Sequence, residues 1–95
     1  MSTDPGPFDL DTAWRLDEQV SIRPERFGAL LYHFGTRRLS FLKSPALLTV
    51  VRSLAEHPTA RAACAGAGVG PPELPRYRAA LAALAASRMI QPRSL

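Results

Sequence analysis

Between Val20 and Leu42 apolar residues recur in short runs separated by turn residues, a pattern that predicts short β-strands joined by tight turns. Val20 and Ile22 alternate with polar neighbours and predict a first strand. We expect this strand to end at Arg23-Pro24-Glu25, because proline donates no ladder hydrogen bond. A second strand is predicted over Phe27–His33.

The chain then reverses at a predicted hairpin turn, Phe34-Gly35-Thr36, in which Gly35 can adopt a positive φ. Arg38–Leu42 returns antiparallel as a third strand. On this strand we expect Leu39 and Phe41 to face the core. Arg38 and Ser40 are expected on the opposite face. No later segment is patterned to pair with it, so its edge is predicted to be free. A free edge can accept another chain as an added strand.

Between Ser44 and Ser87 the apolar spacing changes to three and four residues, which predicts helices. Ser44-Pro45 is a typical helix start, with serine as N-cap and proline at the first helical position. Thr59 can cap a second helix that runs to Ala65, and Pro71-Pro72-Glu73 opens a third. The apolar face of the first helix carries Leu47, Val50, Val51 and Leu54. The apolar face of the third helix carries Leu74, Tyr77, Leu81 and Leu84.

Three strands followed by three helices predict an α+β fold, with a three-stranded antiparallel sheet packed on three helices as in winged helix-turn-helix proteins. The 95 residues suffice for one domain. We assign residues 8–92 to this domain, 1–7 to a flexible N-terminal arm and 93–95 to a C-terminal tail. Trp14 is expected to cover the sheet as part of the core. Met89-Ile90 is expected to lead to Pro92 as a short extended tail.

The charges are distributed unevenly along the chain. Six of the eight acidic residues lie within residues 1–25, whereas from Arg26 onward ten basic residues face only Glu56 and Glu73, a net charge of +8. This body should attract acidic partners, either nucleic acid or an acidic peptide. A high-GC genome would explain the preference for arginine over lysine but not the asymmetry.

Few residues are candidates for catalysis or metal binding. His33, His57 and the single Cys64 have no partner at metal-ligand or catalytic spacing, and a structural role is favoured for each. Asp17-Glu18 is expected to be a solvated pair on a turn. Motifs for phosphate, nucleotide or acyl chemistry are missing, so the sequence predicts neither an enzyme nor a cofactor. An acidic N-terminus and the lack of a long apolar run predict a cytoplasmic protein without membrane contact.

A winged helix-turn-helix could bind DNA, with its third helix in the major groove. Here that helix offers Arg76 and Arg78 followed by an alanine-rich stretch, and alanine cannot read bases by hydrogen bonding. Small side chains instead allow another backbone to approach closely. The composition therefore disfavours nucleic acid and favours a peptide groove between the third strand and the third helix. A homodimer that pairs two copies of the free edge is a further alternative.

The segment AWRLDEQVSIRPERFGALLYHFGTRRLSFLKSP, together with the helices that follow it, resembles the PqqD-like family. Members of this family are the recognition elements of ribosomally made, post-translationally modified peptides, and the similarity is to the branch that serves mycofactocin biosynthesis. The resemblance covers about Phe8 to Pro92, and RPERFGALLY and TRRLSFL carry most of its specificity. It implies a three-stranded sheet on three helices and no catalysis.

The resemblance further implies that a short acidic precursor peptide binds as an added strand on the third strand and is presented to a radical S-adenosylmethionine (SAM) maturase. Carried onto this chain, the binding strand is Arg38–Leu42 and the groove-forming helix is about Pro72–Ser87. We expect arginines to hold the acidic peptide and apolar residues to line its groove. The expected peptide-binding residues are Arg37, Arg38, Leu39, Ser40, Phe41, Leu42, Arg76, Tyr77, Arg78, Ala80 and Leu81.

Overall fold

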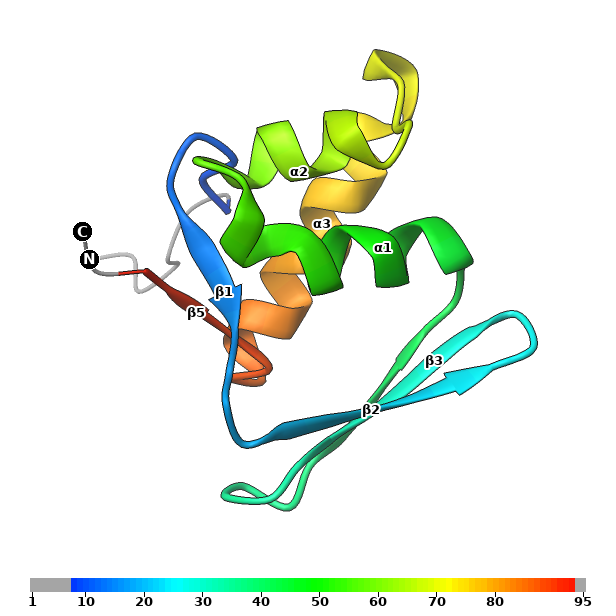
Figure 1. Cartoon of the computed structure of the whole chain (residues 1–95), viewed down its shortest axis with the longest axis vertical. Coiled ribbons are helices and arrows are strands. Elements are labelled where there is room, and N and C mark those ends of the chain that lie inside the picture. Colours follow the sequence, from blue (N-terminus) through cyan, green and yellow to red (C-terminus); the bar gives the residue numbers. More distant parts are fainter. Residues whose placement is uncertain (1–7, 94–95) are drawn as a thin grey trace, which may run out of the picture.

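The computed structural model describes residues 8–93, so the predicted arm over residues 1–7 lies outside the described part of the chain. Within residues 8–93, five strands, three α-helices and two short 3-10 helices follow one another (Figure 1). The strands are β1 (Trp14–Leu16), β2 (Val20–Glu25), β3 (Gly28–His33), β4 (Leu39–Leu42) and β5 (Ile90–Pro92). The helical elements are α1 (Pro45–Ser53), η1 (Leu54–Glu56), α2 (Ala60–Gly66), η2 (Pro71–Glu73) and α3 (Leu74–Ala86).

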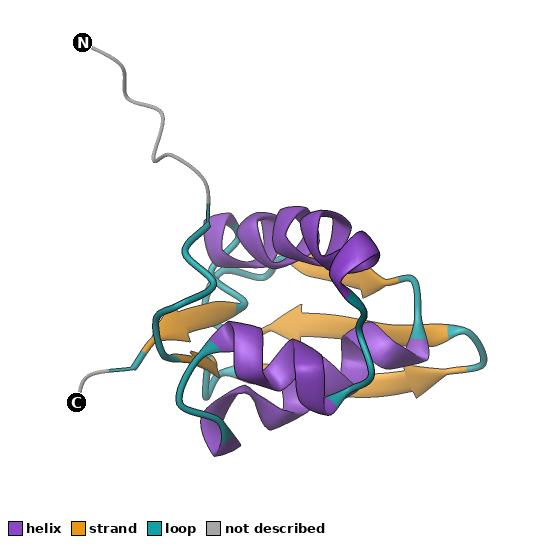
Figure 2. Ribbon diagram, turned by 90° about the horizontal axis from the view of Figure 1, so that it is seen from above, coloured by secondary structure: helices purple, strands orange, loops and turns teal. Residues whose placement is uncertain are grey.

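The predicted three-stranded antiparallel sheet and three α-helices are confirmed. The sheet has the order β2-β3-β4, with Leu31 of the central strand opposite Ile22 on one side and Ser40 on the other. The helices gather on one side of this sheet and leave its other face uncovered (Figures 1 and 2). The core between the two layers includes Leu31, Leu42, Val50, Leu54 and Leu81, which are all almost completely buried.

A second sheet of two strands was not predicted. β1 and β5 pair antiparallel, with Trp14 opposite Pro92, so the segment that we expected to be an extended tail is a strand. Trp14 lies on β1 and not over the large sheet. Its ring stacks on Phe8 with 4.4 Å between centroids, and its indole N–H donates to Thr12 Oγ1 at 2.8 Å. Strands of three residues are too short to show a period-two pattern.

The side chains of β4 point the opposite way from our expectation. Leu39 and Phe41 are 62% and 51% exposed on the uncovered face, and Leu42 is buried. The register explains this reversal: the His33 N–H donates to the Arg38 carbonyl, and a shift of one residue exchanges the faces of a strand. Because Leu39, Phe41 and Leu42 are all apolar, the pattern alone did not fix which face is buried.

The predicted strand end and hairpin turn are confirmed, with two differences in detail. β2 ends at Glu25 but includes Pro24, because the proline lies on an edge strand where its nitrogen faces away from β3. In the β3–β4 turn the positive φ, 63°, belongs to Arg37 and not to Gly35. A Cβ on Gly35 would meet the end of the flexible, exposed Gln19 side chain, which would have to move to make room.

The predicted helix starts are confirmed. The Ser44 hydroxyl accepts a hydrogen bond from the Leu47 N–H at 3.0 Å, and the Thr59 hydroxyl accepts one from the Ala62 N–H at 3.1 Å. Each cap satisfies a backbone donor that has no partner within the helix. At the same end of β4 as the Ser44 cap, a Cβ on Gly28 would overlap the Leu42 carbonyl, so glycine is needed where β3 passes this close to β4.

Candidate functional site

A groove of about 690 Å³ lies between β4 and α3. Its volume is within the range of about 300–1,000 Å³ that is typical of ligand pockets in proteins. One wall is the end of β4 and the start of α1, and the other wall is one face of α3. The lining residues are Ser40, Phe41, Leu42, Lys43, Ser44, Leu47, Arg76, Tyr77, Ala80, Ala83 and Leu84.

β4 is an edge strand, and its main chain has an open side. In an antiparallel ladder, residues alternate between those that bond to the neighbouring strand and those whose N–H and C=O point away from it. The hydrogen bond from the His33 N–H to the Arg38 carbonyl, 3.0 Å long, fixes the phase of this alternation. Ser40 and Leu42 therefore bond to β3, whereas the main-chain groups of Leu39 and Phe41 point outward. These outward groups can form hydrogen bonds with an added strand.

The α3 wall is built mainly from small and apolar residues at helical spacing. Arg76, Ala80 and Ala83 are separated by four and three residues, so they lie on one helical face. Tyr77 and Leu84, seven residues apart, are both buried in the core beside this face. The alanine methyl groups leave the space that a larger side chain would fill.

The structure brings six of the predicted peptide-binding residues together in the groove: Ser40, Phe41, Leu42, Arg76, Tyr77 and Ala80. Leu39 is exposed on β4, and Arg37 and Arg38 are exposed in the preceding turn. Arg78 is exposed on α3 but does not line the groove, and Leu81 is fully buried.

Five lining residues were missed: Lys43, Ser44, Leu47, Ala83 and Leu84. The last two could have been found from helical spacing, since Ala83 follows Ala80 by three residues and Leu84 follows Tyr77 by seven. Lys43 and Ser44 continue the predicted strand into the predicted helix start. No comparable signal in the sequence marks Leu47 as a groove residue, because its place in the helical stripe predicts only burial.

The groove carries positive charge at its rim. Lys43 and Arg76 are its only charged lining residues among those the structure describes, and both are exposed. Arg76 already has an acidic neighbour, since its guanidinium lies 3.7 Å from the Glu73 carboxylate. That ion pair is exposed to solvent and therefore contributes little to stability. An acidic ligand can compete with Glu73 for the guanidinium.

Comparison with protein families gives a match over residues 13–91 to the model described as the peptide chaperone MftB family. The chain belongs to this family. A protein named peptide chaperone MftB from Mycobacterium ulcerans is 60% identical over 87 residues, which are 92% of this chain and 80% of that protein. The homologue of that name from Mycobacterium tuberculosis is 56% identical over 90 residues, or 95% of this chain and 83% of the relative.

A third peptide chaperone MftB, from Mycolicibacterium smegmatis, is 55% identical over 85 residues, 90% of this chain and 83% of its own length. Comparison with solved structures finds no match. The relatives are named for a binding role and not for a reaction, which agrees with the prediction that the chain is no enzyme.

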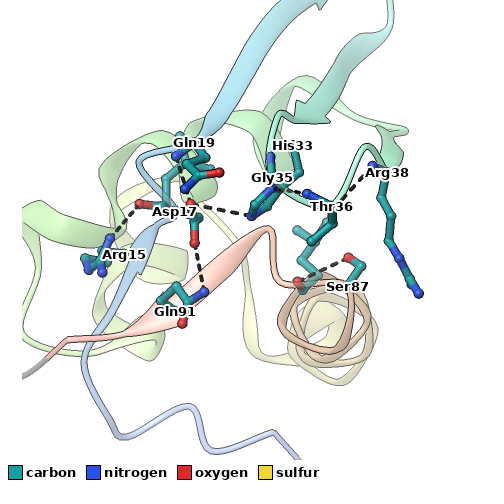
Figure 3. Close-up of polar contacts among 11 residues, drawn as sticks. Arg15, Asp17, Gln19, His33, Gly35, Thr36, Arg38, Ser87 and Gln91 are labelled. Carbon is teal, nitrogen blue, oxygen red and sulfur yellow. Dashed lines mark hydrogen bonds and ion pairs between the residues drawn. The ribbon is translucent and has the colours of Figure 1, made fainter.

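In this member of the MftB family, a partly buried polar clasp joins the two sheets (Figure 3). We use this name for Asp17, Gln19, His33 and Gln91. The Asp17 carboxylate accepts hydrogen bonds from the Gln19 main-chain N–H and from the Gln91 side chain, each 2.8 Å long. These bonds, together with the nearby His33 and Arg15, hold the pKa of Asp17 below its ordinary value of 3.8 despite partial burial. The expected solvated Asp17-Glu18 pair is therefore wrong for Asp17.

His33 connects this clasp to the β3–β4 turn. Its Nδ1 accepts hydrogen bonds from the main-chain N–H groups of Gly35 and Thr36, at 3.0 and 3.1 Å. Nε2 lies 3.5 Å from Asp17 Oδ1. Since His33 is 5% exposed and both ring nitrogens have partners, its position supports the predicted structural role. The clasp fixes the turn that leads into β4.

The described residues contain no cluster of three or more His, Cys, Asp or Glu side chains that could hold a metal ion. Cys64 is free and buried, and its burial raises the pKa of the thiol, which opposes nucleophilic chemistry. Among the helices of residues 8–93, none is long and apolar enough to cross a membrane.

Proposed function

We propose that this protein is a non-catalytic peptide chaperone of mycofactocin biosynthesis. It binds the short acidic precursor peptide as an added strand on β4 and delivers it to a radical SAM maturase. The observation that carries the proposal is the coincidence of an open strand edge with an apolar groove of about 690 Å³ at the same place. The names of the relatives support the chaperone role.

Strand addition explains how one site can hold an extended peptide. The added strand would lie about 4.8 Å from β4 and exchange main-chain hydrogen bonds with Leu39 and Phe41. Alternate peptide side chains would then enter the groove beside Tyr77 and Ala80. Leu81 would act from beneath, by holding α3 against the core. Main-chain bonds would provide much of the affinity, and the shape of the groove would select the side chains.

Positive charge would draw the acidic peptide to this edge. Arg37, Arg38, Arg76 and Arg78 are all exposed, and Lys43 adds a further cation at the groove. Long-range attraction of this kind raises the association rate more than the final affinity. In this proposal residues 8–92 form the whole binding domain, and the protein acts in the cytoplasm, where a free thiol such as Cys64 stays reduced.

The decisive experiment is a calorimetric titration of the purified protein with the acidic precursor peptide encoded beside it. Random duplex DNA serves as the control ligand. We expect saturable one-to-one binding of the peptide and none of the DNA. Salt-sensitive DNA binding without peptide binding would instead support the winged-helix alternative. Sedimentation of the free protein shows whether β4 edges pair in a homodimer, which the peptide should then dissociate.

A further inference from the structure

The uncovered face of the three-stranded sheet is unusually apolar. Among the described residues, the large hydrophobic side chains that are exposed are Phe27, Phe34, Leu39 and Phe41, with 71%, 60%, 62% and 51% of their surface accessible. All four belong to β4 or to the turns beside β3, and none belongs to a helix. The helices lie on the other side of the sheet (Figure 1).

These side chains form one continuous patch. The register places Leu30 between Arg23 and Phe41, and Tyr32 between Ser21 and Leu39. Phe34 packs edge-on against Tyr32 with 5.0 Å between ring centroids. Phe27 lies with Leu30 and Phe41 around a shallow depression of about 300 Å³. We define the outer-face patch as Phe27, Leu30, Tyr32, Phe34, Leu39 and Phe41.

We propose that the outer-face patch is the docking surface for the protein that receives the peptide. That partner would present a folded apolar surface bordered by carboxylates. The inference rests on the proposed function, because only a chaperone that hands on its peptide requires such a receiver. Exposed apolar clusters of this kind mark protein interaction sites. Aromatic side chains are also enriched among the residues that contribute most to binding energy.

The position of the patch next to the peptide groove supports this occupant. Phe41 lines the groove with one part of its surface and the shallow depression with another. Its main-chain groups also point to the open edge of β4. A protein docked on the outer face therefore lies alongside a peptide added to β4, and the two interfaces meet at Phe41. The receiving protein can then reach the peptide while the chaperone still holds it.

The charges beside the patch select the kind of surface that fits. Arg23 and Arg26 border it, and the guanidinium of Arg26 lies 5.8 Å from the centre of the Phe27 ring. Glu25 also lines the shallow depression and pairs with Arg23 at 3.3 Å, whereas Arg26 forms no ion pair among the described residues. Arg26 therefore favours a carboxylate on the partner. A second copy of this chain would instead bring like charges together.

A second extended peptide is a poor occupant for the same face. The N–H and C=O groups of a strand lie in the plane of its sheet, so the face offers side chains and no free main-chain partners. A peptide lying there would leave its own backbone groups without hydrogen bonds. A folded protein has already satisfied its backbone and can bury the aromatic side chains without that cost.

The test measures binding of the radical SAM maturase of the proposed function to variants of the outer face. Phe27→Ser, Phe34→Ser and Arg26→Glu alter residues that are absent from the peptide groove. Arg52→Glu, on the exposed side of α1, is the control for the charge reversal. Peptide affinity and thermal unfolding are measured on each variant. We expect at least about a tenfold loss of maturase affinity for each phenylalanine variant, with peptide affinity unchanged within about twofold.

Unchanged maturase affinity in folded Phe27→Ser and Phe34→Ser variants would overturn the inference. So would a wild-type dimer that both variants convert to monomers while maturase affinity stays the same, since the occupant would then be a second copy. The inference would also be overturned if both variants lose binding to vesicles of anionic phospholipid but bind the maturase with unchanged affinity. Failure of the wild type to bind the peptide would count against the proposed function, whereas the maturase titration would still test the docking surface.

Discussion

The three-stranded sheet has two edges, and they are built differently. On β2 the Phe34 N–H donates to the Gln19 carbonyl, and the alternation that follows from this bond points the main-chain groups of Val20, Ile22 and Pro24 outward. Proline has no N–H, so one of those outward positions cannot accept an added strand. The edge also carries the exposed Arg23–Glu25 ion pair. Proline and charge are the usual means by which proteins protect an edge from pairing.

Within β4 itself there is neither a proline nor a charged residue, although the exposed Arg38 and Lys43 flank the strand. Its outward groups belong to Leu39 and Phe41, the strand contains no proline, and a groove runs beside it. The two edges flank the same central strand in one small domain, so a general tolerance for open edges would affect both. The difference supports the proposal that the β4 edge is kept open for a ligand. Each of the following experiments changes one side of this difference.

The largest effect is expected from closing the β4 edge. Leu39→Pro removes an outward N–H and places a ring where the peptide backbone would lie, while the bonds from Ser40 and Leu42 to β3 remain. We expect peptide affinity to fall at least about 30-fold, or roughly 2 kcal/mol, measured by calorimetry.

Leu39→Ala is the matched control, since it removes the exposed side chain but keeps the N–H. Its affinity should stay within about threefold of the wild type. Circular dichroism confirms that both variants fold. If folded Leu39→Pro binds the peptide as the wild type does, the peptide is not an added strand on β4.

The second-largest effect is expected from changing the polar clasp. Its residues Asp17 and Gln19 lie just before β2, and its His33 contacts the turn before β4. Asp17→Asn removes the charge from a carboxylate whose side chain is 13% exposed. We expect a loss of about 1–2 kcal/mol in the free energy of unfolding. Asp11→Asn is the control, because the pKa of Asp11 is also lowered, by its hydrogen bond to Arg61, but this pair is exposed and should contribute little.

The stability that Asp17 contributes should also depend on pH. The folded-state pKa of Asp17 lies below its ordinary value of 3.8, so the unfolded chain takes up a proton first as the pH falls. The stabilisation by Asp17 is therefore complete above about pH 5 and is lost as the pH falls through the folded-state pKa. Chemical denaturation between pH 7 and pH 3 should show a smaller decline for Asp17→Asn. Equal declines in both proteins would exclude this role.

A third effect is expected from filling the groove beside the β4 edge. Ala83→Leu adds three carbon atoms to the α3 wall, where they would occupy the space of a peptide side chain. Peptide affinity should fall about five- to tenfold, or roughly 1 kcal/mol, while thermal stability changes little because Ala83 is exposed. Ala86→Leu changes an exposed alanine of the same helix outside the groove and should bind normally. Equal affinities of the two variants would place the peptide elsewhere.

The large sheet and the helices were predictable because each has a local signal. Period-two alternation marks the start of β2, a short apolar run bounded by turn residues marks β3, and Ser44 and Thr59 mark helix starts that the structure confirms. The small sheet has no such signal, since β1 and β5 have three residues each and pair Trp14 with Pro92 across most of the chain. Pairing of that kind depends on the tertiary packing and not on local preference.

The site was partly predictable for the same reasons. The free edge followed from the order of the strands, and the small residues of α3 followed from composition. The sequence did not predict which side chains of β4 face the groove, because Leu39, Phe41 and Leu42 are all apolar. The face that each residue occupies depends on the register set by the β3–β4 turn. The open groups of Leu39 and Phe41, and hence the choice of Leu39 for the proline test, required the register.

A smaller effect should follow from reducing the charge at the β4 edge. Arg76→Gln removes an exposed cation of the groove, and we expect a two- to threefold loss of peptide affinity at low salt. At about 1 M salt, where the screening length is about 3 Å, the difference should vanish. Arg52→Gln, an exposed arginine on α1, is the control and should change affinity at neither salt concentration. A loss for Arg76→Gln that persists at high salt would indicate a direct contact and not long-range attraction.

The smallest change in peptide affinity is expected from opening the β2 edge. Pro24→Thr restores an outward N–H with a residue that favours strands, and Pro24 is exposed, so the fold should tolerate it. If proline protects this edge, the variant should self-associate at lower concentration than the wild type in sedimentation experiments. Peptide affinity should stay within about twofold, and the stoichiometry should remain one to one, because the groove that selects the side chains lies only beside β4. Binding of a second peptide would show that an open edge suffices, and the contrast between the two edges would then rest on Pro24 alone.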